Sequence, residues 1–148
     1  MKLIDRWIRD ITSIVGFPII VLISIGLLVW GKIEIMWEFI FALIVSELII
    51  YIIRYFYFRP RPIGKRDGFT SLFERLDESS FPSVHAARAS VMAVTLSQSL
   101  SLTAKIILWV VATTICASRI YLKRHHLSDV IVGGILGLVI GYIAILLI

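Results

Sequence analysis

A polar stretch from Ser118 to Asp129, between two apolar runs, contains residue types that could transfer a phosphoryl group. His125 and Asp129 are four residues apart, so a helix that begins near Leu127 would place them one turn apart on the same face. The carboxylate could then accept a hydrogen bond from one imidazole nitrogen, fix the tautomer and leave the other nitrogen free to attack an electrophile. Arg119 adds a planar guanidinium that matches phosphate oxygens. The stretch therefore indicates phosphoryl transfer.

Apolar segments separate this stretch from the other polar patches. These segments must position the polar side chains that could do chemistry. Of the 148 residues, 59% are hydrophobic, a larger share than soluble domains contain. The sequence predicts an all-α integral membrane bundle of about five transmembrane helices, formed by residues 1–148 as one domain of a multi-pass protein in the cell membrane. The expected spans are Ile11–Trp30, Ile35–Phe58, Val84–Leu102, Thr103–Leu122 and Leu127–Ile148.

Residues 59–81 form the one substantial polar segment between spans. Pro60 and Pro62 should end the second span, because proline disrupts a helix and restricts the residue before it. Ser71 and Glu74 have the spacing of a capping box, and apolar residues around them recur on one helical face. We expect a short amphipathic helix on the membrane surface, either a lid or a passive surface element.

The order of the spans brings the polar patches to one side of the membrane. The second span ends on the side where the third begins, and the fourth returns to that side, where the fifth begins. Residues 54–84 and 118–129 are therefore expected to meet. An error of one span between them would place them on opposite sides of the bilayer.

Together the patches resemble the three motifs of the type-2 phosphatidic acid phosphatase family, which is related to the vanadium-dependent haloperoxidases. The family motifs are Lys, six residues, Arg-Pro; Pro-Ser-Gly-His; and Ser-Arg, five residues, His, three residues, Asp. The third motif is complete here, whereas Arg54 replaces the lysine of the first and Val84 the glycine of the second. The matching positions run from Arg54, Arg61 and Pro62 through Pro82, Ser83 and His85 to Ser118, Arg119, His125 and Asp129.

This resemblance implies a single transmembrane phosphatase domain that hydrolyses a lipid monophosphate or a polyprenyl diphosphate without a metal or another cofactor. His125 would form a phosphohistidine, oriented by Asp129. His85 would protonate the leaving group and then activate water. The expected phosphate-binding groups are Arg54, Arg61, Ser83, Arg119 and the main-chain N–H of Val84.

Two alternative readings of the histidines and arginines stay open. A metal site could be built from His85, His125, His126 and Asp129, although neighbouring arginines would oppose a dication. Alternatively, the arginines could serve only membrane topology and headgroup contacts.

A different class of function also stays open, a non-catalytic lipid-phosphate-binding or transport protein of the same fold, and Glu47 bears on it. It lies near the middle of the second span, where an ionisable group is costly. A structural hydrogen bond or an ion path would each explain it. The polar side chains considered as its partner are Ser24, Ser90, Gln98 and Thr113.

The formal net charge of +5 indicates membrane lipid as a partner rather than nucleic acid, because Lys and Arg crowd around the ends of apolar segments. Most of the remaining basic residues lie on the side of the motifs, so the positive-inside rule places the site in the cytoplasm. Many members of the resembling family work on the outer face, so the two indications oppose each other. Gly133, Gly137 and Gly141 form a bare stripe that could pack within the chain or in a homo-oligomer.

Overall fold

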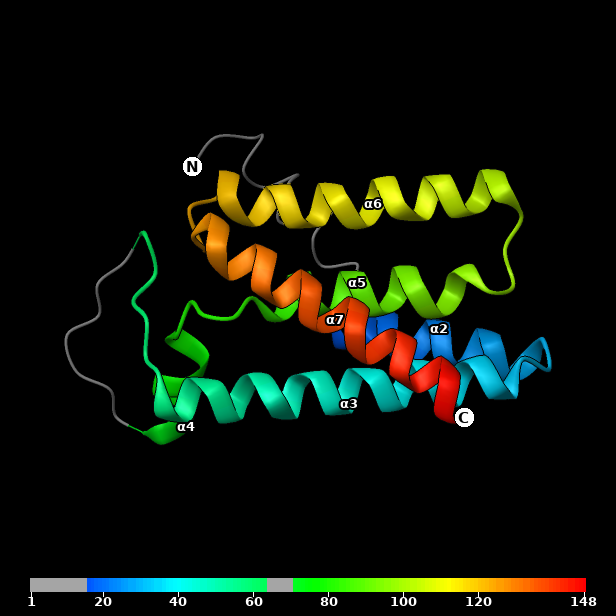
Figure 1. Ribbon diagram of the computed structural model, residues 1–148, viewed down its shortest axis with the longest axis horizontal. Coiled ribbons are helices and arrows are strands. Elements are labelled where there is room, and N and C mark those ends of the chain that lie inside the picture. Colours follow the sequence, from blue (N-terminus) through cyan, green and yellow to red (C-terminus); the bar gives the residue numbers. More distant parts are fainter. Residues whose placement is uncertain (1–15, 64–70) are drawn as a thin grey trace.

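The computed structural model describes residues 16–63 and 71–148, and within them it is an all-α bundle without strands (Figure 1). The all-α architecture predicted from the sequence is confirmed. The first predicted span begins at residue 11, so its first five residues lie outside the described part. The helices are α2 (Phe17–Val29), α3 (Ile33–Phe56), α4 (Leu72–Glu78), α5 (Val84–Ser97), α6 (Leu102–Tyr121) and α7 (Leu127–Leu147).

Three of the described helices are long and apolar enough to cross a membrane: α3 with 24 residues, α6 with 20 and α7 with 21. The α2 helix is apolar but has 13 residues, and α5 has 14 and ends at Ser97 rather than at the predicted Leu102. A serine-rich turn explains this early end, since Ser101 already caps α6 by accepting a hydrogen bond from Ala104 N. The number of full-length spans thus differs from the five predicted.

The α5 helix is the central element of the bundle, which explains why it can be short. Nine of its residues are buried, and several are alanines that let neighbouring helices approach. A Cβ atom on Gly133 of α7 would lie 2.4 Å from Ser83 O, and one on Gly137 would lie 2.3 Å from Ala87 O. The glycine stripe therefore packs against α5 inside the chain.

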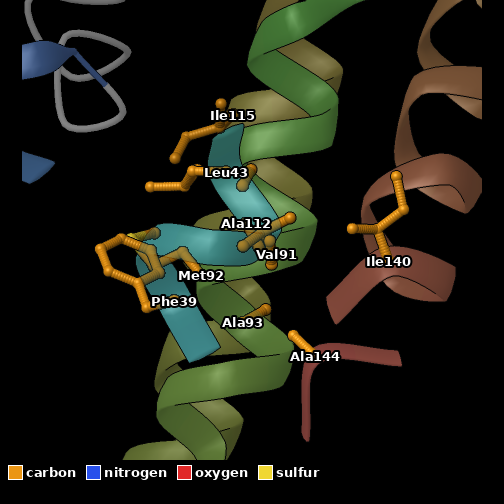
Figure 2. Close-up of a cluster of buried hydrophobic side chains, with 11 residues drawn as sticks. Phe39, Leu43, Val91, Met92, Ala93, Ala112, Ile115, Ile140 and Ala144 are labelled. Carbon is orange, nitrogen blue, oxygen red and sulfur yellow. The ribbon is translucent and has the colours of Figure 1, made fainter. Parts of the chain in front are cut away.

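Larger apolar side chains fill the rest of the core (Figure 2). Phe39 of α3, Ile115 of α6 and Ile140 of α7 are almost fully buried and surround α5. By contrast, the outward faces of the long helices carry exposed aliphatic side chains such as Ile44 and Val110. An apolar exterior around a close-packed interior is what a bundle needs in hydrocarbon.

One end of the bundle gathers the polar segments. The α3 and α6 helices end there, α7 begins there, and α4 lies beside them (left in Figure 1). The main-chain N–H of Ser83 donates to Asp129 O at 3.0 Å, which joins the start of α5 to the start of α7. The prediction that residues 54–84 and 118–129 meet is thereby confirmed.

Candidate active site

A cavity of about 370 Å³ opens at this end of the bundle. Its wall contains five arginines and a single carboxylate, Asp77, so it suits a multiply charged anion. Two histidines, His85 and His125, also line it, so most of the predicted site residues are brought together. The full lining is Tyr51, Arg54, Arg61, Asp77, Val84, His85, Arg88, Arg119, Leu122, Arg124 and His125.

His125 lies in the loop just before α7 and is 4% exposed. Its Nδ1 atom is 2.6 Å from the main-chain oxygen of Ser80. Because a carbonyl oxygen only accepts hydrogen bonds, Nδ1 carries the proton and the lone pair is on Nε2. The imidazole is therefore held in the tautomer that a nucleophilic Nε2 requires.

The hydrogen bond predicted between His125 and Asp129 is not formed. The distance from His125 Nδ1 to Asp129 Oδ2 is 3.9 Å, which is too long for a hydrogen bond. The Asp129 carboxylate instead closes the capping box of α7 by accepting from His126 N at 2.8 Å. It also accepts from Arg59 Nη1 at 2.6 Å. Asp129 thus acts on His125 through its charge and by fixing the loop.

Arg59 is a site-supporting residue that the sequence analysis missed. Besides its bond to Asp129, its Nη1 donates to Ser128 Oγ at 2.7 Å. Arg59 follows α3 and Asp129 is in the first turn of α7, so the ion pair ties two distant segments together. No spacing rule links residues 70 positions apart, so only the fold could reveal this pair.

The environment of His125 lowers the pKa of its imidazole to about 4. Burial is the largest cause, because it disfavours the charged form. The guanidinium groups of Arg61 and Arg54 lower the pKa further, against the opposing effects of the Ser80 carbonyl and Asp129. The imidazole is consequently neutral at pH 7, as a nucleophile must be.

Arg54 and Arg119 are buried guanidinium groups, 3% and 7% exposed. Arg54 donates to Leu76 O and Pro82 O, both at 2.9 Å, and Arg119 donates from Nε to Ser118 Oγ at 3.2 Å. Two nitrogens remain without a partner, Arg54 Nε and Arg119 Nη2, and no other buried side-chain nitrogen or oxygen in the described residues does. Leaving charged donors unsatisfied is costly, so both side chains are arranged for an acceptor that enters the cavity.

The short helix α4 positions the first-motif arginines. It begins with the predicted cap, in which Ser71 Oγ accepts from Glu74 N at 3.2 Å. Near its other end, Arg61 donates to Asp77 O at 2.6 Å and to Glu78 O at 3.2 Å. Cations at the carbonyl end of a helix are stabilised by its dipole. The carbonyl end of α4 therefore fixes the position of the Arg61 side chain.

Ser83 was predicted to bind phosphate, but it does not line the cavity. It is fully buried, its N–H donates to the main-chain oxygen of Asp129, and its hydroxyl caps α5 by accepting from Ala86 N at 3.4 Å. Its N–H is therefore not available to phosphate, because it already donates to Asp129 and α5 begins only at Val84. Ser83 supports the site by tying α5 to α7.

Val84 remains a candidate phosphate contact. It is the first residue of α5 and lines the cavity, and its N–H has no acceptor within the described part of the chain. The β-branched side chain is compatible with this position because the backbone is helical there. In the described residues, positive φ occurs only at Gly31 and Lys123.

Comparison with known proteins agrees with this geometry. The model of the PAP2 superfamily matches residues 35–148. The chain belongs to the PAP2 superfamily. This finding confirms the resemblance drawn from the three motifs.

Two crystal structures share the PAP2 fold of this chain. LpxE from Aquifex aeolicus is 28% identical with a TM-score of 0.82, over 98% of this chain and 87% of that one. The transmembrane PAP2-type phosphatidylglycerolphosphate phosphatase from Bacillus subtilis is 25% identical with a TM-score of 0.73, over 97% of this chain and 76% of that one. With the long apolar helices, these relatives identify the PAP2 chain as a membrane protein.

Glu47 of this PAP2 protein has a partner that the sequence analysis did not consider. Its Oε1 lies 2.6 Å from Arg88 Nε, so none of the four polar residues proposed from the sequence is the ion-pair partner. One of those candidates, Gln98, binds Glu38 instead. Arg88 lies one turn after His85 on α5 and faces the same cavity.

The alternative metal site is not formed by these residues. Across residues 16–63 and 71–148, no three His, Cys, Asp or Glu side chains are grouped closely enough to hold a metal ion. His126 is turned away toward Pro60 O, at 3.4 Å from its Nε2.

Proposed function

We propose that this PAP2 protein is a multi-pass lipid phosphatase of the cell membrane that works through a covalent phosphohistidine at His125. The observation that carries the proposal is the pair of buried, unpartnered guanidinium nitrogens, Arg54 Nε and Arg119 Nη2, at a cavity that also contains the neutral His125 imidazole. A phosphoryl group supplies acceptors for both nitrogens and an electrophile for the imidazole. The name of the Bacillus subtilis relative supports a lipid phosphate as substrate.

In the first step, Nε2 of His125 attacks phosphorus and the bond from phosphorus to the lipid oxygen breaks. The bonding electron pair goes to that oxygen, which takes a proton from His85. Guanidinium groups stabilise the charge that spreads over the equatorial phosphoryl oxygens. The phosphorylated imidazole is cationic, and it is stabilised by the Ser80 carbonyl at Nδ1 and by the Asp129 carboxylate 3.9 Å away.

In the second step, His85 is neutral and accepts a proton from a water molecule that attacks phosphorus. The phosphorus–nitrogen bond breaks, its electron pair returns to Nε2, and inorganic phosphate leaves. His85 ends the cycle protonated again. Both steps use positioned charge and two imidazoles, which the cavity wall contains.

The competing transport function loses its main support in this structure. It rested on an ionisable Glu47 within the second span, and Glu47 is neutralised by Arg88 at 2.6 Å. A paired carboxylate between two helices is a structural contact that stabilises the bundle interior. By contrast, Arg54 and Arg119 line the arginine-rich cavity and form no ion pair with a carboxylate among the described residues.

Phosphate release by the detergent-solubilised protein tests the proposal. A panel of phosphatidic acid, phosphatidylglycerophosphate and a polyprenyl diphosphate is assayed in the presence of a chelator. We expect release by the wild type and by His126→Ala, and at least about a 10³-fold loss in His125→Ala, the scale seen when a catalytic nucleophile is removed. A folded wild type that releases no phosphate from any lipid would contradict the proposal.

A further inference from the structure

The first turn of α4 exposes two apolar side chains, Leu72 and Phe73. Leu72 is 47% exposed and Phe73 is 83% exposed. Among the described helices, α4 packs only against α3, and none of the α4 residues is buried. Phe73 lies one turn before Asp77 on the same face of α4, and Asp77 lines the arginine-rich cavity. The exposed phenyl ring is therefore near the rim of that cavity.

The other end of α4 is bonded to two arginines of the cavity wall. Arg54 donates to the main-chain oxygen of Leu76 at 2.9 Å. Arg61 donates to the main-chain oxygens of Asp77 and Glu78 at 2.6 and 3.2 Å. Because α4 has seven residues, it is only about two turns long. A contact that fixes its first turn therefore also fixes the carbonyl groups that hold both guanidinium groups.

The α4 helix lies at the level of the membrane surface. The α3 helix is long enough to cross a membrane, and it ends in the exposed aromatic side chains of Tyr55 and Phe56, followed by Tyr57. Aromatic side chains gather in this way where hydrocarbon meets lipid headgroups. Arg54 is in the last turn of α3 and bonds to Leu76, so α4 lies beside these aromatic residues (Figure 1). The exposed face of α4 thus adjoins the lipid-facing surface of the bundle.

We propose that Leu72 and Phe73 dock into the apolar boundary of the bilayer, and that this contact holds the carbonyl end of α4 against Arg54 and Arg61. The bilayer thereby completes the anion-binding wall from outside the cavity. The partner is the acyl region rather than anionic headgroups, because α4 carries three carboxylates and one guanidinium. The coupling to anion binding rests on the proposed phosphatase function, whereas the docking itself does not.

A spin label tests the docking directly. Phe73→Cys in a Cys116→Ser background provides one attachment site, because Cys116 is the only native cysteine. In phosphatidylcholine vesicles, we expect relaxation of the label by oxygen, which concentrates in hydrocarbon, to exceed relaxation by a water-soluble nickel chelate. Glu74→Cys in the same background is the control, at the next position of the same turn, and should give a lower oxygen-to-nickel ratio. A ratio at position 73 that is no higher than at position 74 would overturn the docking.

The inhibition constant of inorganic phosphate tests the coupling. It is measured in the same vesicles against the lipid that the wild type hydrolyses fastest, and it does not depend on the fraction of folded enzyme. We expect Phe73→Ser to raise it about fivefold or more, the low end of the usual coupling between two sites. Phe73→Leu keeps an apolar side chain and should stay near the wild type. The matched control is Phe56→Ser, which removes a ring 80% exposed from α3 and should leave the constant unchanged.

The two measurements separate the possible failures. A docked label together with an unchanged inhibition constant in Phe73→Ser would overturn the coupling to Arg54 and Arg61. An equal rise in Phe56→Ser would also overturn it, because any lost bilayer contact would then have the same effect. Absence of hydrolysis of every lipid by the folded wild type would overturn the phosphatase function, and the spin label would still decide the docking.

Discussion

Arg59 and Asp129 form a 2.6 Å ion pair that joins the segment after α3 to the first turn of α7. The Asp129 carboxylate has no exposed surface, whereas the Arg59 side chain is 29% exposed. The pair therefore anchors the loop that carries His125, while the Ser80 carbonyl fixes the imidazole tautomer. A histidine–carboxylate hydrogen bond would both anchor the loop and fix the tautomer. In this protein the Arg59–Asp129 pair anchors the loop, and the Ser80 carbonyl fixes the tautomer.

Removal of the Arg59 charge should loosen the His125 loop. We expect Arg59→Gln to lower stability by about 1–3 kcal/mol, because a buried carboxylate loses its partner while the partly exposed site admits water. The thermal midpoint in detergent should fall, and kcat should fall with it because the loop positions the nucleophile. Lys105→Gln, which removes a charge at the other end of α6, is the control and should keep both values. A wild-type midpoint in Arg59→Gln would show that the ion pair does not support the loop.

The contact between Gly133 and Ser83 should be intolerant of any side chain. A Cβ atom at position 133 would meet main-chain atoms of Ser83 at 2.4 Å, so α7 must shift from α5. We expect Gly133→Ala to destabilise the protein by about 1–3 kcal/mol or more, as overpacking does. Gly26→Ala is the matched control, because a Cβ atom there meets nothing within 4 Å and alanine favours helix. Thermal midpoints of both variants in one detergent measure the difference, and equal midpoints would exclude the close packing.

Arg119 should contribute directly to anion binding. Its Nη2 atom has no hydrogen-bond partner within the protein, so it can donate to an anion in the cavity. We therefore expect Arg119→Gln to weaken competitive inhibition by inorganic phosphate about tenfold to hundredfold. Inhibition constants measured at several phosphate concentrations check this. The control is Arg75→Gln, since Arg75 lies over the Phe58 ring and does not line the cavity. An unchanged inhibition constant in Arg119→Gln would place the anion elsewhere.

The depressed pKa of His125 should make the native protein sensitive to acid. The folded imidazole has a pKa of about 4, against 6.5 for an ordinary histidine, so the unfolded state binds more protons between these values. The stability contributed by the neutral imidazole is fully present above pH 6.5 and decreases as pH falls toward 4. We expect the thermal midpoint of the wild type to decline more steeply from pH 7 to pH 5 than that of His125→Asn. Parallel declines would show that the pKa of His125 is not depressed.

Much of the fold follows from the sequence, because apolar length and proline positions largely determine where helices lie in such a chain. Span order alone predicted that residues 54–84 and 118–129 would meet, since each crossing reverses the side of the membrane. The length of α5 was harder to predict, because a helix enclosed by others need not match the thickness of hydrocarbon. The cap at Ser71 was predictable because it depends on residues three positions apart.

The sequence predicted which side chains line the site better than it predicted their hydrogen-bond and ion-pair partners. The arginine and histidine positions follow local spacing, so the sequence placed Arg54, His85 and Arg119 correctly at one cavity. The acceptor for His125 is a main-chain oxygen, and every residue has one, so the sequence contains no signal for Ser80. Partners such as Glu47 and Arg88 depend on how two helices pack, and that register is set by the whole core.

The most direct measurement of the central claim is the capture of a phosphorylated His125. In His85→Ala the first step is slower without its acid and the second step lacks its base, so phosphate that reaches the imidazole should remain there after a single turnover with ³²P-labelled lipid. We expect acid-labile radioactivity on the protein, mapped to His125 by mass spectrometry and absent from the double variant His85→Ala with His125→Ala. Label that is absent, or that maps to another residue while the protein still hydrolyses the lipid, would contradict the account.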